Sequence, residues 1–298
     1  MHRTLALALL TVFAACVRGA PPISAKAKFN GTAALAYSTR ATSFGQRPSG
    51  SEAIVRLRSW IVSELKPTDA EVSLDSFTAS TPAGSIPMAN VIARFSGVSG
   101  KAVVITGHYD TKRIPLENFV GANDGGSSTG FLLELARVVS QQKRTDDIYL
   151  VWLDGEEAVA RWSDSDSLYG SRHLARKWLS EGVLGKIKAL INVDMIGDKD
   201  LGLVKESNSS ASLVDLVWQT ANKIGDGKYF LQTGGPIEDD HIPFIREGVN
   251  AIDLIDFDYG LQNSYWHTGK DTPDKLSAHS FQVLGDVLVE TVAELQAR

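Results

Sequence analysis

The chain has 298 residues, of which 43% are hydrophobic and 22% are charged, and with these globular values it can bury one large core. We therefore expect a single α/β domain, because no linker divides the sequence into two units. The formal net charge of -5 is spread along the chain without a run of lysines or arginines, which argues against a nucleic-acid partner.

The first twenty residues have the pattern of an export leader. A short positive start precedes an apolar run over residues 5–16, which is too short to span a bilayer. Cleavage after Ala20 and acylation of Cys16 as a lipid anchor are both open, because neither site has its preferred neighbouring residue. Either alternative predicts an exported protein, whether periplasmic, anchored to the cell envelope or secreted. Its mature domain would cover residues 21–298, and because Cys16 is the only cysteine, that domain has no disulfide or thiolate zinc site.

The predicted elements begin with a helix that starts at Ser49 and Glu52 and ends at Pro67. Ser49 and Glu52 are spaced like a capping box before an apolar helix face. Five short β-rich runs follow, at residues 90–95, 102–106, 148–153, 189–193 and 249–255. Helical patterns separate them, and a last helix is predicted over residues 284–295. This alternation predicts a mostly parallel central sheet flanked by helices.

Acidic and histidine side chains follow the ends of three predicted strands or lie in loops. They are His108 and Asp110 after 102–106, Glu156 and Glu157 after 148–153, Asp194 after 189–193, and Asp124 and His267 in loops. In open α/β sheets, ligands bind beyond the carboxyl ends of the strands, because several loops converge there. We therefore expect these side chains to meet on one rim of the sheet.

Asp124, Glu157 and His267 match the ligand count of a catalytic zinc site. Such a site holds zinc with three protein ligands, here histidine and carboxylate, and leaves a fourth position open. Taken alone, an aspartate in a glycine-rich turn is more often a turn residue or helix cap, and a glutamate pair after a strand is more often a solvated loop. Their joint placement at strand ends favours a metal site.

The order and spacing of five motifs resemble those of peptidase family M28, the zinc aminopeptidases, over nearly the whole mature chain. The motifs are Gly107-His108-Tyr109-Asp110, Asn123-Asp124-Gly125, Gly155-Glu156-Glu157, Asp194-Met195-Ile196-Gly197 and His267-Thr268. The resemblance implies two zinc ions and a general base. The implied roles are one zinc on His108 and Asp194, the other on Glu157 and His267, Asp124 as the bridge, and Glu156 as the base.

Three features move the resemblance toward the glutaminyl cyclases of this family. The segment over 156–174, with Trp162, resembles the cyclases' own version of this loop. The segment over 238–244 is similar to the cyclase segment that places an acid, here Asp239, beside the catalytic glutamate. Trp266 precedes His267, where cyclases use a tryptophan to wall the pocket. In contrast, the form of residues 123–126 is closer to that of the peptidases.

The resemblance thus implies a zinc-dependent glutaminyl-peptide cyclotransferase, which converts the N-terminal glutamine of peptides or proteins to pyroglutamate with release of ammonia. The expected roles are ligation of one zinc by Asp124, Glu157 and His267, proton transfer by Glu156, Asp239 and Asp194, and substrate binding by Trp162 and Trp266. In this reading His108 is only a neighbour of the zinc site. The alternatives are a two-zinc aminopeptidase, which would use His108 and Asp194 for a second ion, and a non-catalytic domain with the same fold.

Overall fold

The structure is a computed structural model, which describes residues 28–115 and 118–298. The predicted leader, its cleavage site and Cys16 lie outside the described residues. Within the described part of the chain, no helix has both the length and the apolar character needed to cross a membrane.

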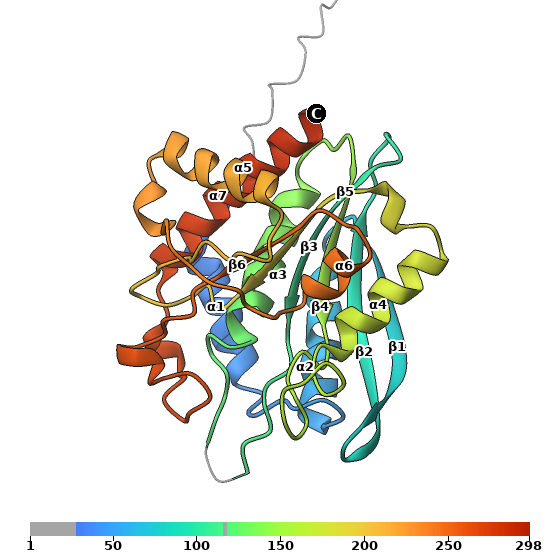
Figure 1. Ribbon diagram of the computed structural model, residues 1–298, viewed down its shortest axis with the longest axis vertical. Helices are drawn as coiled ribbons and strands as arrows, with labels where there is room; N and C mark the ends of the chain where they lie inside the picture. Colours follow the sequence, from blue (N-terminus) through green and yellow to red (C-terminus); the bar gives the residue numbers. More distant parts are fainter. Residues whose placement is uncertain (1–27, 116–117) are drawn as a thin grey trace, which may run out of the picture.

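A mixed six-stranded sheet forms the centre of the domain, in the order β1-β2-β4-β3-β5-β6 (Figure 1). The strands are β1 (Glu71–Thr81), β2 (Gly84–Phe95), β3 (Ala102–His108), β4 (Asp147–Leu153), β5 (Ile187–Asp194) and β6 (Ala251–Ile255). The four strands β4, β3, β5 and β6 are parallel neighbours, whereas β1 and β2 form an antiparallel hairpin whose second strand pairs antiparallel with β4. The predicted single α/β domain with a mostly parallel sheet is confirmed, and β1 is an edge strand that the sequence did not reveal.

Successive residues of the strands face two hydrophobic cores, one on each side of the sheet. In β3, Val103 and Ile105 belong to the larger core and Val104 to the smaller one. The larger core is covered by α1 (Gly31–Thr42), α2 (Glu52–Leu65), α3 (Gly126–Ser140), α5 (Ala211–Ile224) and α7 (Ala278–Ala297). The smaller core is covered by α4 (Tyr169–Ser180) and α6 (Ile242–Arg246) (Figure 1). Burial on both faces explains why the parallel strands are continuous apolar runs.

The first predicted helix, α2, is present, but its predicted cap is wrong. Ser51, not Ser49, caps it, because the Ser51 hydroxyl accepts a hydrogen bond from the N–H of Ile54 at 3.2 Å. Ser49 is buried, and its hydroxyl donates to Asp154 Oδ1 at 2.6 Å. The helix ends before Pro67, as expected, and the predicted C-terminal helix is α7.

Candidate active site

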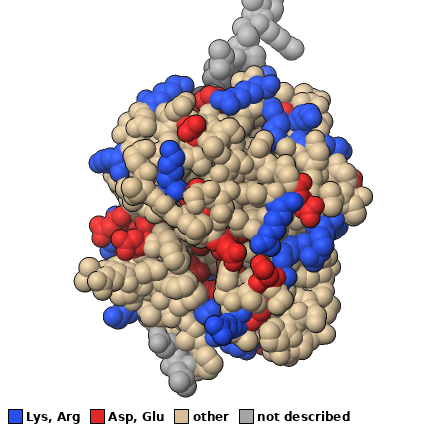
Figure 2. Space-filling model, in the orientation of Figure 1, with Lys and Arg blue, Asp and Glu red and all other residues tan. Residues whose placement is uncertain are grey.

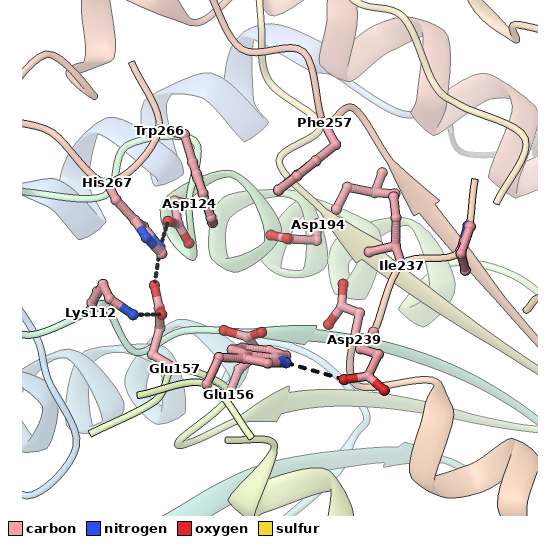
Figure 3. A pocket seen from close by; sticks show the side chains of 14 residues that line it. Lys112, Asp124, Glu156, Glu157, Asp194, Ile237, Asp239, Phe257, Trp266 and His267 are labelled. Carbon is pink, nitrogen blue, oxygen red and sulfur yellow. Dashed lines mark hydrogen bonds and ion pairs between the residues drawn. The ribbon is translucent and has the colours of Figure 1, made fainter. Parts of the chain in front are cut away.

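The predicted site residues converge at the carboxyl ends of the parallel strands. His108 is the last residue of β3, Asp194 is the last residue of β5, and the pair Glu156 and Glu157 follows β4. Asp124 lies two residues before α3, and His267 comes from the loop between β6 and α7. Figure 3 shows Asp124, Glu157 and His267 pointing toward one another. The expected meeting of these side chains on one rim is therefore confirmed.

Among the described residues, Asp124, Glu157 and His267 form the first of two groups that could hold a metal ion. His267 Nε2 lies 2.8 Å from Glu157 Oε1 and 3.1 Å from Asp124 Oδ2. The candidate ligand atoms all lie within 4.8 Å of one another. The two carboxylates are buried, whereas His267 is partly exposed on a loop where its φ is 53°.

His108, Asp124 and Asp194 form the second group. His108 Nε2 lies 3.1 Å from Asp194 Oδ1 and 3.3 Å from Asp124 Oδ1. Burial disfavours the charged imidazole, but the carboxylates of Asp194, Asp110 and Asp124 together raise the pKa of His108 well above its ordinary value. Asp124 thus presents one carboxylate oxygen to each histidine and belongs to both groups. His108 faces the shared carboxylate, a position that fits either a neighbour of the first group or a ligand of a second ion.

The donor set of both groups fits zinc. Imidazole nitrogens and carboxylate oxygens are ordinary zinc ligands, and three of them leave room for a substrate atom. Asp124 Oδ2 is buried without a hydrogen-bond partner, although it faces His267. A buried carboxylate oxygen without such a partner is costly, and a cation between the two side chains removes that cost.

Asp194 of the second group faces a cavity together with two further acids, Glu156 and Asp239 (Figure 3). Burial, followed by the charges of Glu157, Asp239 and Asp240, raises the pKa of Glu156 well above its ordinary value, although His108 opposes the shift. Burial likewise raises the pKa of Asp194 to about 7.

A glycine turn presents Glu156 and Glu157 to the site. Gly155 has a φ of 73°, and a Cβ atom there would lie 2.6 Å from Met88 Sδ. The carboxylate of Asp110 accepts the N–H groups of Glu156 and Glu157 at 3.1 and 3.3 Å. Glycine is therefore required at position 155 for the pair to leave β4 in this direction.

We expect Gly155→Ala to lower the free energy of unfolding by about 1 to 3 kcal/mol, because alanine is strained at this φ and meets Met88. The displaced turn should also weaken metal binding through Glu157. Gly182→Ala is the matched control, because Gly182 has a φ of 69° and open space around its missing Cβ. Thermal unfolding and metal content are the measurements. Equal metal binding by the two variants would contradict a role for the turn in placing Glu157.

Two further residues of the site carry no signal in the sequence. The carboxylate of Asp271 accepts the N–H groups of Asn123 and Asp124 at 2.8 and 3.2 Å, and the Tyr259 hydroxyl donates to it at 2.8 Å. Lys112 Nζ lies 3.3 Å from Glu157 Oε2. Asp271 therefore fixes the backbone of one candidate ligand, and Lys112 adds positive charge beside another.

A pocket of about 540 Å³ opens beside both groups. Trp266 stacks on His267 with ring centroids 4.0 Å apart and packs edge-on against Phe257 at 5.0 Å. Trp162 donates from Nε1 to Glu238 Oε2 at 3.3 Å. Both predicted tryptophans line the pocket, and Figure 2 shows acidic side chains in the hollow at the middle of this face. The space suits a small side chain held between apolar walls.

Comparison with known proteins gives one family match, one similar sequence and two similar structures. Residues 90–292 match peptidase family M28. The chain is 31% identical to a glutaminyl-peptide cyclotransferase-like protein of Bos taurus, over 83% of this chain and 72% of that protein. Its structure is similar to that of an Acidobacteriales bacterium glutaminyl cyclase, with a TM-score of 0.88 and 40% identity over 95% of this chain and 100% of the other. It is also similar to a leucine aminopeptidase precursor of Bacteroides thetaiotaomicron, with a TM-score of 0.81 and 25% identity over 91% and 99% of the two chains.

Proposed function

The chain belongs to peptidase family M28 and is related to its glutaminyl cyclases, and from this premise we propose that it is a zinc-dependent glutaminyl-peptide cyclotransferase. Its substrates are peptides or proteins with an N-terminal glutamine, and its products are the pyroglutamyl peptide and ammonia. The observation that carries the proposal is the pocket in which Trp162 and Trp266 stand beside Glu156 and the metal-binding groups. Such walls favour an intramolecular reaction, because they hold a small side chain and exclude water.

The reaction needs an electrophile and a proton carrier. A zinc ion held by Asp124, Glu157 and His267 would polarise the side-chain amide of the substrate as a Lewis acid. The α-amine nitrogen of the substrate forms a bond to the amide carbon, and the bond from that carbon to the amide nitrogen breaks. Glu156 takes the proton from the amine and delivers it to the departing nitrogen, which leaves as ammonia.

Asp239 supports this proton transfer through its charge, and Asp194 lines the same pocket. Burial raises the pKa of Glu156 well above its ordinary value, and the charge of Asp239 adds to the rise, so that this carboxyl group keeps its proton more readily than an ordinary glutamate. A group whose pKa lies near the working pH can accept and donate within one turnover. Glu156, supported by Asp239, therefore suits a proton carrier that has the same protonation state before and after each turnover.

A two-zinc aminopeptidase is the second candidate, and the group His108, Asp124 and Asp194 favours it. The deciding experiment incubates the purified protein with a Gln-peptide and with a Leu-peptide. Release of ammonia and of free amino acid is followed separately. We expect ammonia from the first and no free leucine from the second. Free leucine without any pyroglutamate would assign the protein to the aminopeptidases.

His108→Ala distinguishes one bound metal ion from two. We expect about one zinc per chain in both the parent and the variant, because the first group keeps its three ligands, as a catalytic zinc site requires. The variant should still release ammonia from Gln-peptides. It should be less stable than the parent, because the buried carboxylates of Asp110, Asp124 and Asp194 lose a cationic neighbour. His173→Ala, at a partly buried histidine paired with Asp75 outside the pocket, is the control. Two zinc ions in the parent and one in the variant would contradict the prediction.

The compartment is part of the same proposal. The leader-like pattern of residues 1–20 supports export, and cleavage after Ala20 or a lipid anchor at Cys16 both stay predictions. N-terminal sequencing and mass spectrometry of the protein from its native cells would distinguish them. An intact Met1 on a cytosolic product would contradict export.

A further inference from the structure

The stretch that carries Asp239 to the pocket has no regular secondary structure. Residues 237–241, which we name the pocket segment, precede α6 without belonging to a strand or helix. Ile237 and Asp239 of this segment line the pocket, and Asp239 is buried with its Oδ2 lacking a hydrogen-bond partner. Since no strand or helix holds these residues, their position depends on contacts from elsewhere in the fold.

Besides the hydrogen bond of Trp162 to Glu238, several of these contacts come from one loop, residues 205–209, which we name the mounting loop. It follows β5 and precedes α5. Three of its hydrogen bonds reach the pocket segment or the residues just before it. They run from Lys205 N–H to Thr233 O at 3.3 Å, from Ser207 N–H to Gly235 O at 3.2 Å and from Asn208 Nδ2 to Ile237 O at 2.9 Å.

Glu206 is the side chain that joins the two segments. It is 2% exposed. Its Oε1 accepts the N–H groups of Asn208 at 2.7 Å and Ile237 at 3.0 Å. Its Oε2 accepts the N–H and hydroxyl of Ser209 at 2.7 and 2.8 Å and lies 3.2 Å from His241 Nε2. One buried carboxylate therefore accepts hydrogen bonds from its own loop and from the start of the pocket segment, and it lies in ion-pair distance of His241 at the end of that segment.

The surroundings of Glu206 keep it ionised. Burial opposes the charge, but His241 and the N–H groups of Asn208 and Ile237 outweigh it and hold the pKa of Glu206 at about 2. His241 is fully buried and comes two residues after Asp239. Hydrogen bonds to an ionised, buried acceptor are stronger than neutral ones, so this junction is rigid.

We propose that Glu206 is a positioning residue for cyclisation, which holds Asp239 and Ile237 in the place where they face Glu156 and the substrate. Glu206 itself does not line the pocket and is absent from both metal-binding groups. It acts through the pocket segment alone. The inference rests on the proposed function, because it takes Asp239 to take part in proton transfer.

The test is Glu206→Gln, which keeps the size of the side chain and removes its charge. We expect kcat for ammonia release to fall about 10 to 100-fold, because a displacement of about 1 Å in a reacting group costs on this scale. Zinc content should not change. Glu134→Gln is the matched control, because Glu134 is equally buried, accepts the N–H of Asn30 at 2.9 Å and lies in α3 outside the pocket. The control should lose stability and keep its kcat.

A double-mutant cycle shows whether Glu206 acts through Asp239. In an Asp239→Asn background, Glu206→Gln should lower kcat by less than about twofold, because coupled residues are not additive. Full kcat in Glu206→Gln, with only a lower melting temperature, would overturn the inference. Full kcat in Asp239→Asn would instead remove Asp239 from the proposed mechanism, whatever Glu206→Gln does.

His241→Asn is the second variant for this test, to be used if Glu206→Gln yields no folded protein. It removes one end of the junction and leaves the backbone hydrogen bonds of Glu206 intact. We expect the same fall in kcat with unchanged zinc content. An unchanged kcat in the folded His241→Asn variant would equally overturn the positioning role.

Discussion

Glu156→Gln is expected to lower the rate of ammonia release from Gln-peptides by about 100 to 10,000-fold, the usual scale for a positioned general base. Glutamine fills the same space but cannot take a proton from the amine. Zinc should remain bound, because Asp124, Glu157 and His267 are unchanged and their ligand atoms lie within 4.8 Å of one another without Glu156. Steady-state kinetics and metal analysis on the same sample are the measurements.

The control for this prediction is again Glu134→Gln, which changes an equally buried glutamate outside the pocket. It should leave the rate within about threefold of that of the parent, because Glu134 lies outside the pocket and both metal-binding groups and so adds little to the activation barrier. If Glu156→Gln, with zinc bound, also retained a rate in that range, another group would have to carry the proton. The acids that remain in the pocket, Asp194 and Asp239, would then be tested in the same way.

Asp124→Ala is expected to abolish both metal binding and ammonia release. Asp124 faces His108 through Oδ1 and His267 through Oδ2, so its loss removes a ligand from each metal-binding group at once. No other described carboxylate takes part in both groups. The expected result is therefore the same for one zinc ion and for two, measured by metal analysis after dialysis and by an ammonia assay.

Asp146→Ala is the matched control for Asp124→Ala. Asp146 is also buried and paired with a cation, Lys188, but it lies just before β4, at the end of the strand opposite Glu156. The control should lose stability and keep its zinc. Stoichiometric zinc in folded Asp124→Ala would show that the metal is held elsewhere and would remove the basis of the proposed site.

The sequence predicted the central strands and their polar ends because both signals are local. β3, β4 and β5 are buried apolar runs, and each is followed directly by the residues that form the rim. β1 has no such signal, since it is an edge strand in which Leu74 is 51% exposed and most residues are polar. The choice of Ser51 over Ser49 as the helix cap depends on Asp154, which lies 105 residues from Ser49 in the sequence.

The candidate site likewise contains some residues that the sequence predicts and others that it does not. The proposed ligands stand in recognisable motifs, so that their meeting could be expected from strand order. Asp271 and Glu206 could not be found, because their partners are mostly backbone N–H groups that only the folded chain brings to them. Lys112 likewise has no motif that connects it with Glu157, from which it is separated by 45 residues.

The metal-binding groups join parts of the chain that are far apart, from His108 in β3 to His267 before α7. An unfolded chain offers no such set of ligands, so a zinc ion held by these groups would bind the folded state in preference. Mass action would then make the stability of the protein depend on free zinc, with a gain of about 4 kcal/mol when zinc exceeds its dissociation constant about 1,000-fold. An exported enzyme of this kind would fold to its full stability only where its surroundings supply the ion, which makes zinc availability outside the cell a limit on its lifetime as well as on its activity.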